Sequence, residues 1–179
     1  MCLTIGRAYD IPTVALRYFN VYGPRQALSN PYTGIAAIFS SRILNDNPPC
    51  IFEDGRQSRD FIHISDIVRA NLLAMQNKKA DYEVFNVGTG RPLSVLDIAQ
   101  GLIGELKSSV DIDIVRKYRV GDIRHCYANV SKIQKKLGFK PRLKFEEGIS
   151  DLVEWVKRQK AVDQFWKSQR ELKKKGLTR

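Results

Sequence analysis

The fold is organised around the stretch DGRQSRDFIHISD, Asp54 to Asp66. Its Asp-Gly step predicts a turn directly after the apolar run Ile51-Phe52, and a basic polar loop then leads into a β-like run, Phe61 to Ile64. Ser65 suits the N-cap of a following helix, because Asp66 would then place a negative charge in the first helical turn. The stretch therefore predicts a strand end and a helix start that hold a basic loop between them.

Arg59 is the candidate ligand-binding residue of this loop. In open α/β sheets ligands bind outside the carboxyl ends of the strands, and a planar guanidinium there can grip a phosphate or a carboxylate with two parallel hydrogen bonds. A salt bridge from Arg59 to Asp60 or Asp54 on a surface turn explains the same residues equally well. The stretch alone leaves both interpretations open.

Strand-like and helix-like segments alternate along the rest of the chain. Helices are predicted over 1–9, 34–44, 65–77, 94–107, 130–137, 145–160 and 161–179, and strands over 13–19, 50–52, 61–64, 83–87 and 111–115. The strand over 13–19 carries enough apolar residues to be buried on both faces, as inner strands of parallel sheets are. The connections are long enough for crossovers, which indicates an α/β fold with parallel pairing.

Two helix ends carry local signals. Ser94-x-x-Asp97 predicts a capping box, and Gly138 is a favoured residue directly after a helix. The tail over 161–179 is basic and amphipathic, and it is expected to fray.

Length and composition favour one globular domain, or a piece of a larger α/β protein. The 179 residues are 43% hydrophobic and 27% charged, and no run approaches the roughly 18 apolar residues of a membrane span. The first residues do not resemble a secretory signal, since no basic region leads a long apolar core. Three scattered cysteines are too few for a disulfide framework, which favours a reducing cytoplasm.

The net charge of +11 raises the question of a nucleic-acid partner. Residues 1–100 hold 10 Lys and Arg against 9 Asp and Glu, whereas residues 101–179 hold 20 against 10. The excess lies on two helix-like stretches, 132–144 and 157–175, and lysines on an amphipathic helix usually form a solvated face. The interpretation is therefore no nucleic acid and no membrane, with polyanion binding kept as an alternative.

Polar residues at strand ends are the candidates for chemistry. They are Asn20, Arg59 and the irregular segment 119–124, in which Arg119 and Asp122 flank a glycine and can aim at a ligand. Arginines on separate loops suit a diphosphate, because each can share charge over several oxygens. The alternative is that Arg119 and Asp122 pair with each other.

Other patterns favour structural roles. Gly88-Thr89-Gly90 lies between a strand and a helix, but Leu93 occupies the place of the third glycine of a dinucleotide motif, so a structural turn is the better interpretation. His63 inside a strand reads as a hydrogen-bonded packing residue. Adjacent His125 and Cys126 point apart in an extended chain, so no metal site is predicted.

Five motifs in order then resemble one known family. They are LRYFNVYGPRQ at 16–26, DGRQSRDFIH at 54–63, FNVG at 85–88, RVGD at 119–122 and LGFKP at 137–141. Over about residues 1–160 they resemble the C-terminal half of extended short-chain dehydrogenase/reductases, the NAD-dependent epimerases and dehydratases of nucleotide sugars. Within that family the resemblance points to 4-epimerases of the UDP-glucose and dTDP-L-rhamnose kind.

The resemblance implies a fold and partners. The fold would be the C-terminal part of a Rossmann-like parallel sheet plus the small α/β substrate-binding domain. Residues 1–26 would end the Rossmann domain, 27–160 would form the mixed sheet edge and the substrate-binding domain, and 161–179 a basic helical tail. The implied cofactor is NAD, the implied partner is a UDP- or dTDP-sugar, and the full-length protein would be a homodimer.

The resemblance also assigns roles around the diphosphate and the cofactor. Phe19 would lie near the nicotinamide, and the amide of Asn20 would contact the sugar diphosphate. Arg59 would grip the diphosphate, and Arg119 would contact phosphate.

The nucleoside end of the substrate is assigned in the same way. Asp122 would bind the nucleoside ribose. The backbone around Ile51 and Phe52 would face the pyrimidine base.

The family's chemistry moves a hydride from sugar C4 to NAD and returns it to the other face of a rotated 4-keto sugar. It uses a tyrosine base with a lysine four residues later, and that pair and the glycine-rich NAD motif belong upstream of the residues that match Met1 onward. Tyr9 is followed by Thr13 and Tyr18 by Tyr22 at this spacing. No catalytic residue is therefore assigned, and the chain alone is expected to be inactive.

Two alternatives share these motifs. A nucleotide-sugar 4,6-dehydratase or a UDP-glucuronate decarboxylase differs mainly in the acid and base residues. A non-catalytic sugar-nucleotide-binding fragment is the alternative of another class.

Overall fold

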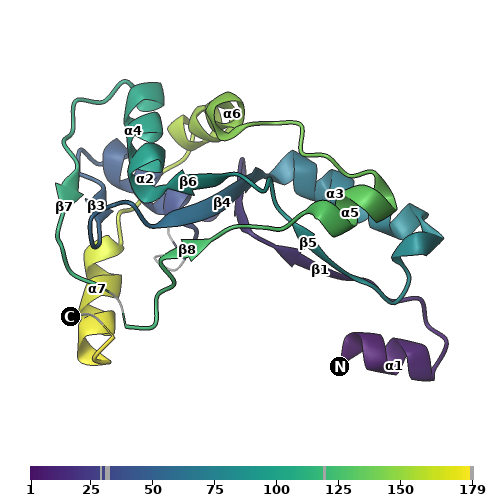
Figure 1. Ribbon diagram of the computed structural model, residues 1–179. Helices are drawn as coiled ribbons and strands as arrows, with labels where there is room; N and C mark the ends of the chain where they lie inside the picture. The colour runs from purple at the N-terminus through teal and green to yellow at the C-terminus, as the bar shows by residue number, and fades with distance from the viewer. Residues whose placement is uncertain (29, 31–32, 119, 178–179) are drawn as a thin grey trace.

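The computed structural model describes residues 1–28, 30, 33–118 and 120–177, which form short, mainly parallel strands covered by helices (Figure 1). The helices are α1 Cys2–Ala8, α2 Ile35–Leu44, α3 Ile64–Gln76, the 3-10 helix η1 Lys78–Ala80, α4 Val95–Leu106, α5 Ser131–Leu137, α6 Phe145–Lys157 and α7 Phe165–Lys174. The strands are β1 Ala15–Tyr18, β2 Asn20–Tyr22, β3 Cys50–Ile51, β4 Ser58–His63, β5 Val84–Val87, β6 Pro92–Ser94, β7 Asp113–Ile114 and β8 His125–Cys126. The expected α/β class with parallel pairing is confirmed.

Strand β4 is the centre of the sheet structure. It pairs in parallel with β2 and β8 and antiparallel with β6, so three strands are built on its six residues. Two further parallel pairs, β1 with β5 and β3 with β7, complete the strands that the structure describes. The stretch that decides the fold therefore supplies its most connected strand.

Two hydrophobic clusters lie on either side of this strand. The first contains Phe61 of β4 together with residues of α2, α4 and α6. The second contains Ile62 of β4 together with residues of α3, α5 and β5. Successive side chains of a strand point to opposite faces, so β4 contributes to both clusters.

The structure corrects two expectations around β4. The strand begins at Ser58, so Arg59 is its second residue and does not lie on a loop at a carboxyl end. The short strands β6 and β8 were not predicted, because their few residues become strands only by pairing with β4. Partner strands, which the local sequence does not reveal, explain both differences.

Helix ends follow the local signals with one exception. The Ser94 and Asp97 capping box is present, and Gly138 ends α5 in the left-handed region with φ of 67°. Ser65 is not the N-cap of α3, because that helix begins one residue earlier and His63 caps it, with Nδ1 accepting from the Ser65 amide at 3.3 Å. The prediction of a serine cap was wrong by two residues.

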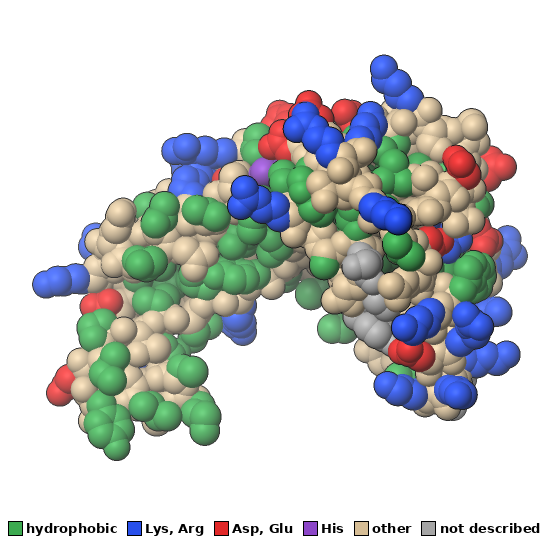
Figure 2. All heavy atoms as spheres, turned by 180° about the vertical axis from the view of Figure 1, so that it is seen from behind, with side chains coloured by type: hydrophobic (Ala, Val, Ile, Leu, Met, Phe, Trp, Pro, Cys, Tyr) green, Lys and Arg blue, Asp and Glu red, His purple; other side chains and the backbone are tan. Residues whose placement is uncertain are grey.

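One surface of the molecule is apolar. Tyr18 of β1 is 46% exposed, and Val68, Leu72 and Met75 of α3 are also exposed. Hydrophobic side chains spread over the end of the molecule that holds α1, β1 and α3, whereas basic side chains gather near α7 (Figure 2). The expectation that the strand over 13–19 is buried on both faces is wrong, because Arg17 and Tyr18 of β1 are exposed and Ala15 and Leu16 are only half-buried. No described helix has the length and apolar character of a membrane span.

Candidate functional site

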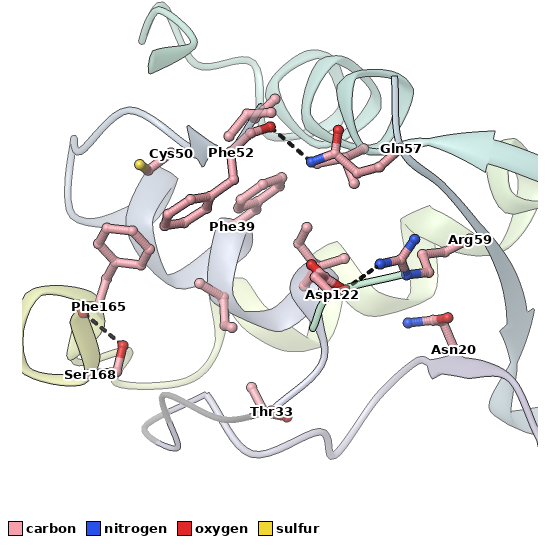
Figure 3. Close-up of a pocket in the computed structure, with 14 residues that line it drawn as sticks. Asn20, Thr33, Phe39, Cys50, Phe52, Gln57, Arg59, Asp122, Phe165 and Ser168 are labelled. Carbon is pink, nitrogen blue, oxygen red and sulfur yellow. Dashed lines mark hydrogen bonds and ion pairs between the residues drawn. The ribbon is translucent and has the colours of Figure 1, made fainter. Parts of the chain in front are cut away.

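A cavity of about 230 Å³ lies beside the start of β4 and has two unlike ends (Figure 3). Its polar end is formed by Asn20, Arg59 and Asp122, and its aromatic end by Phe39, Phe52 and Phe165. These residues come from β2, β4, the segment before β8, α2, the segment after β3, and α7. Segments far apart in the sequence therefore build one elongated hollow.

The cavity brings together five of the residues singled out in the sequence. They are Asn20, Ile51, Phe52, Arg59 and Asp122. Phe19 is not among the described lining residues; it lies between β1 and β2 and packs, partly buried, against the second cluster. Arg119 lies outside the described residues.

Strand pairing positions the polar end. Asn20 lies opposite Phe61 in the parallel register of β2 and β4. Arg59 precedes Phe61 by two residues, so both side chains leave the same face of β4. The register therefore places an amide and a guanidinium on one side of the sheet.

The guanidinium of Arg59 is held by three hydrogen bonds. Nη2 donates to Asp122 Oδ1 at 2.8 Å, and Nη1 donates to the carbonyl oxygens of Ser58 at 2.9 Å and Arg124 at 3.1 Å. The Arg59 side chain is 17% exposed. Five N–H groups are available to an arginine, so two remain for an anion beyond these described contacts.

Asp60 and Asp54, the carboxylates first considered as partners of Arg59, contact other groups. Asp60 is fully buried and accepts four hydrogen bonds, from the amides of Thr89, Gly90 and Ala128 and from the Thr89 hydroxyl, at 2.6 to 3.1 Å. Asp54 pairs with Arg124 instead, at 2.7 Å. The surface-turn interpretation of Arg59 is therefore wrong, and Asp122 is its acidic partner.

The Gly88-Thr89-Gly90 turn does not fit a dinucleotide. A dinucleotide pyrophosphate would need free amides at a turn that opens a helix, but β6 follows this turn and the Asp60 carboxylate already accepts from two of its amides. A Cβ at Gly88 would lie 2.5 Å from Asp60 Oδ2, so the carboxylate fills the turn closely. The hydrogen bonds of Asp60 support the structural interpretation of this turn.

His63 is a packing residue, as predicted. Its ring is buried against Tyr22 at 5.3 Å between centroids, and Nδ1 contacts Ser65 Oγ at 2.8 Å. Burial lowers the pKa of His63, against an opposing effect of Asp151 and Asp66. No cluster of His, Cys, Asp and Glu side chains in the described part of the chain has the arrangement of a metal site.

Arg124 organises the acidic turn next to the cavity. Its two Nη atoms pair with Glu53 at 2.5 Å and Asp54 at 2.7 Å. The hydrogen bond from Arg124, followed by that from the Arg56 amide, lowers the pKa of Asp54 to about 2. The ion pairs join the turn after β3 to the segment that carries Asp122.

The Arg124→Ala variant is expected to raise the pKa of Asp54 toward its ordinary value of 3.8. A carboxyl group whose pKa is lower in the folded chain than in the unfolded chain stabilises the fold at any pH above the unfolded pKa. This contribution is lost as the pH falls through the folded pKa of about 2. The pH dependence of stability in that window should therefore flatten in the variant. An NMR titration of the Asp54 carboxyl carbon measures the pKa directly.

Arg56→Ala is the matched control for this titration. It removes a neighbouring cation and keeps the Arg56 amide that donates to Asp54 at 3.0 Å. A pKa that stays near 2 in Arg124→Ala, or that rises equally in both variants, would contradict the assignment.

The aromatic end contains residues that the sequence did not single out. Phe165 and Ser168 of α7 line the cavity and are 5% and 3% exposed. The tail was expected to fray, but α7 packs its first turn against the body of the protein. The amphipathic spacing of the tail was the available signal, since residues three or four apart share a helix face.

Comparison with known proteins identifies a family. Residues 1–88 match the model of the NAD dependent epimerase/dehydratase family. The dTDP-L-rhamnose 4-epimerase of Burkholderia thailandensis is 34% identical over 149 residues, which cover 83% of this chain and 41% of that protein. A putative UDP-glucose 4-epimerase of Methanocaldococcus jannaschii is 36% identical over 152 residues, covering 85% of this chain and 48% of that protein.

Solved structures that resemble this chain include an epimerase as well. The crystal structure of UDP-glucose 4-epimerase from Thermotoga maritima, with UDP-glucose, matches with a TM-score of 0.79 and 38% identity. The match covers 87% of this chain and 49% of that one, which supports the Rossmann-like α/β class. The chain spans about half the length of the relatives that it matches.

Proposed function

Because this chain belongs to the NAD dependent epimerase/dehydratase family, we propose that it forms the nucleotide-sugar-binding part of a nucleotide-sugar 4-epimerase. The proposed substrate is a UDP- or dTDP-sugar. The single observation that carries the proposal is the cavity, in which a guanidinium, an amide and a carboxylate face one end and aromatic rings the other. This polarity suits a molecule with a diphosphate next to a flat base.

Each residue of the polar end has a proposed role. Arg59 binds the diphosphate through its remaining N–H groups, and Asn20 donates its amide hydrogen to the same group. Asp122 holds Arg59 in place and accepts a hydrogen bond from the ribose. Arg119 is proposed to contact phosphate as well.

The aromatic end receives the base. Ile51 and Phe52 belong to one segment at the end of β3, and they face the base in this proposal. An apolar wall with a few polar groups is typical of a site that binds a small molecule.

The cofactor of the family is NAD, which accepts and returns the hydride of C4 when bound. The turn over 88–90 does not fit it, since Asp60 accepts hydrogen bonds from two amides of that turn. Phe19, proposed to lie near the nicotinamide, is away from the lining of the cavity. The role proposed for this chain is therefore to bind and orient the sugar nucleotide.

Calorimetric titration of the purified chain tests the proposal. UDP and dTDP should bind more tightly than GDP or inorganic pyrophosphate, and no turnover of a sugar nucleotide is expected from the 179-residue chain alone. Equal affinity for all four ligands, or a steep loss of binding with salt that is matched by single-stranded DNA, would favour the polyanion alternative. Epimerisation by the purified chain would contradict the assignment of no catalytic residue.

A further inference from the structure

Helix α7 forms part of the cavity although it lies outside the residues that match the family model. Phe165, its first residue, borders the aromatic end together with Phe52 (Figure 3). Ser168 lies one turn later and is also a lining residue, with its hydroxyl donating to the Phe165 carbonyl at 2.7 Å. The tail therefore contributes side chains to the site.

A buried ion pair fixes the start of this helix. Asp163 Oδ2 accepts from Arg42 Nη1 at 3.1 Å and from Asn47 Nδ2 at 3.0 Å, and Asp163 Oδ1 accepts from the Phe165 amide at 2.9 Å. The Arg42 side chain is 4% exposed, and its guanidinium carbon lies 4.4 Å from the centre of the Phe165 ring. The hydrogen bonds of Asp163 and the contact with Arg42 together hold the Phe165 ring in position.

A second hollow of about 280 Å³ lies behind the aromatic end. It shares Cys50, Phe52 and Phe165 with the cavity, so the two spaces adjoin at these residues. Gln169 lines the second hollow and follows Phe165 by four residues, which places both on one face of α7. Its Nε2 is buried, and no acceptor for it exists among residues 1–28, 30, 33–118 and 120–177.

An unsatisfied buried amide donor beside two aromatic rings suits a flat ligand with carbonyl oxygens. Leaving such a donor without a partner costs free energy, which a ligand acceptor would restore. Aromatic side chains stack on bases of any sequence, and the carbonyl oxygens of uracil or thymine accept hydrogen bonds at the rim of the ring. The Phe165 ring and the Gln169 amide of α7 therefore complement the flat ring and the carbonyl oxygens of a pyrimidine base.

We propose that α7 recognises the pyrimidine base of the nucleotide, with Phe165 stacking on the ring and Gln169 Nε2 donating to a carbonyl oxygen of the base. This inference rests on the proposed function and extends it to specificity. The base lies where the two hollows meet, and the diphosphate remains at the polar end. Helix α7 thus sets the affinity for the nucleoside without touching the diphosphate.

Calorimetric titration of the full chain with UDP and with inorganic pyrophosphate tests this role. Phe165→Ala is expected to weaken UDP binding by about tenfold or more, since base stacking on an aromatic side chain is worth a factor of this order, and to leave pyrophosphate binding unchanged. Gln169→Glu replaces the donor with an acceptor, so it should weaken UDP binding more than Gln169→Ala does. Lys167→Ala, at an exposed position of the same helix, is the control and should bind both ligands like the wild type.

The outcomes separate the inference from the proposed function. UDP affinity that is unchanged in both Phe165→Ala and Gln169→Glu would overturn the role of α7 while leaving the sugar-nucleotide site intact. A wild-type chain that binds pyrophosphate and does not bind UDP more tightly would overturn the proposed function. If Phe165→Ala unfolds, Phe165→Leu keeps the apolar volume and removes the stacking ring, and a wild-type affinity of that variant together with Gln169→Ala would likewise contradict the inference.

Discussion

Alanine in place of Arg59 is expected to weaken the binding of UDP or dTDP by about 100-fold, the largest effect expected of any side chain in the cavity. The guanidinium is mostly buried and fixed by Asp122 and two carbonyl oxygens, so little freedom is lost when it binds an anion. Its removal would leave the diphosphate without its main positive partner and Asp122 without its counter-charge. Titration calorimetry with UDP, dTDP and pyrophosphate measures the loss, which should be shared by all three ligands.

Two further variants make the Arg59 result specific. Arg59→Lys keeps the charge and loses the planar fork, so an intermediate affinity is expected. Arg56→Ala removes an exposed arginine just before β4 that is not among the described lining residues, and it should bind like the wild type. Equal losses in Arg56→Ala and Arg59→Ala would show that only the net charge of the region matters.

Asparagine in place of Asp60 is expected to lower the free energy of unfolding by about 3 kcal/mol or more. The fully buried carboxylate accepts four hydrogen bonds, from the turn of Thr89 and Gly90 and from Ala128. An asparagine offers one oxygen, and its amide group would face two of the four groups that donate to the carboxylate. Since a domain is stable by only about 5–15 kcal/mol, this loss is a large share of the total.

Urea denaturation followed by circular dichroism measures the effect of Asp60→Asn. Asp111→Asn is the control, because Asp111 is exposed and the same chemical change there should alter stability by less than about 0.5 kcal/mol. A loss below about 1 kcal/mol in Asp60→Asn would show that the hydrogen bonds to this carboxylate contribute little.

The sequence predicted those parts of the fold that depend on neighbouring residues. The capping box of Ser94 and Asp97 and the stop at Gly138 are decided within one helical turn, and both are present. Strands β6 and β8 depend on pairing with residues of β4 that lie 32 or more positions earlier in the chain, so their own residues carry little signal. Local rules therefore found the α-helices and the short strands β3 and β7, and they missed β6 and β8.

The candidate site was predictable where motifs carry it. Asn20, Arg59 and Asp122 were singled out at strand ends and on an irregular segment, and the structure places them on one cavity. The contribution of Phe165 was missed because it depends on the contact with Arg42, more than 120 residues away in the chain. The amphipathic spacing of the tail predicts a packed helix face, but it does not reveal which distant residue that face contacts.

The position of β4 between the two hydrophobic clusters has a consequence for how the molecule unfolds. Phe61 belongs to one cluster and Ile62, its neighbour in the chain, to the other. Neither cluster can separate from the rest without straining the backbone that anchors the other. The two clusters are therefore expected to unfold together, as a single cooperative unit joined by β4.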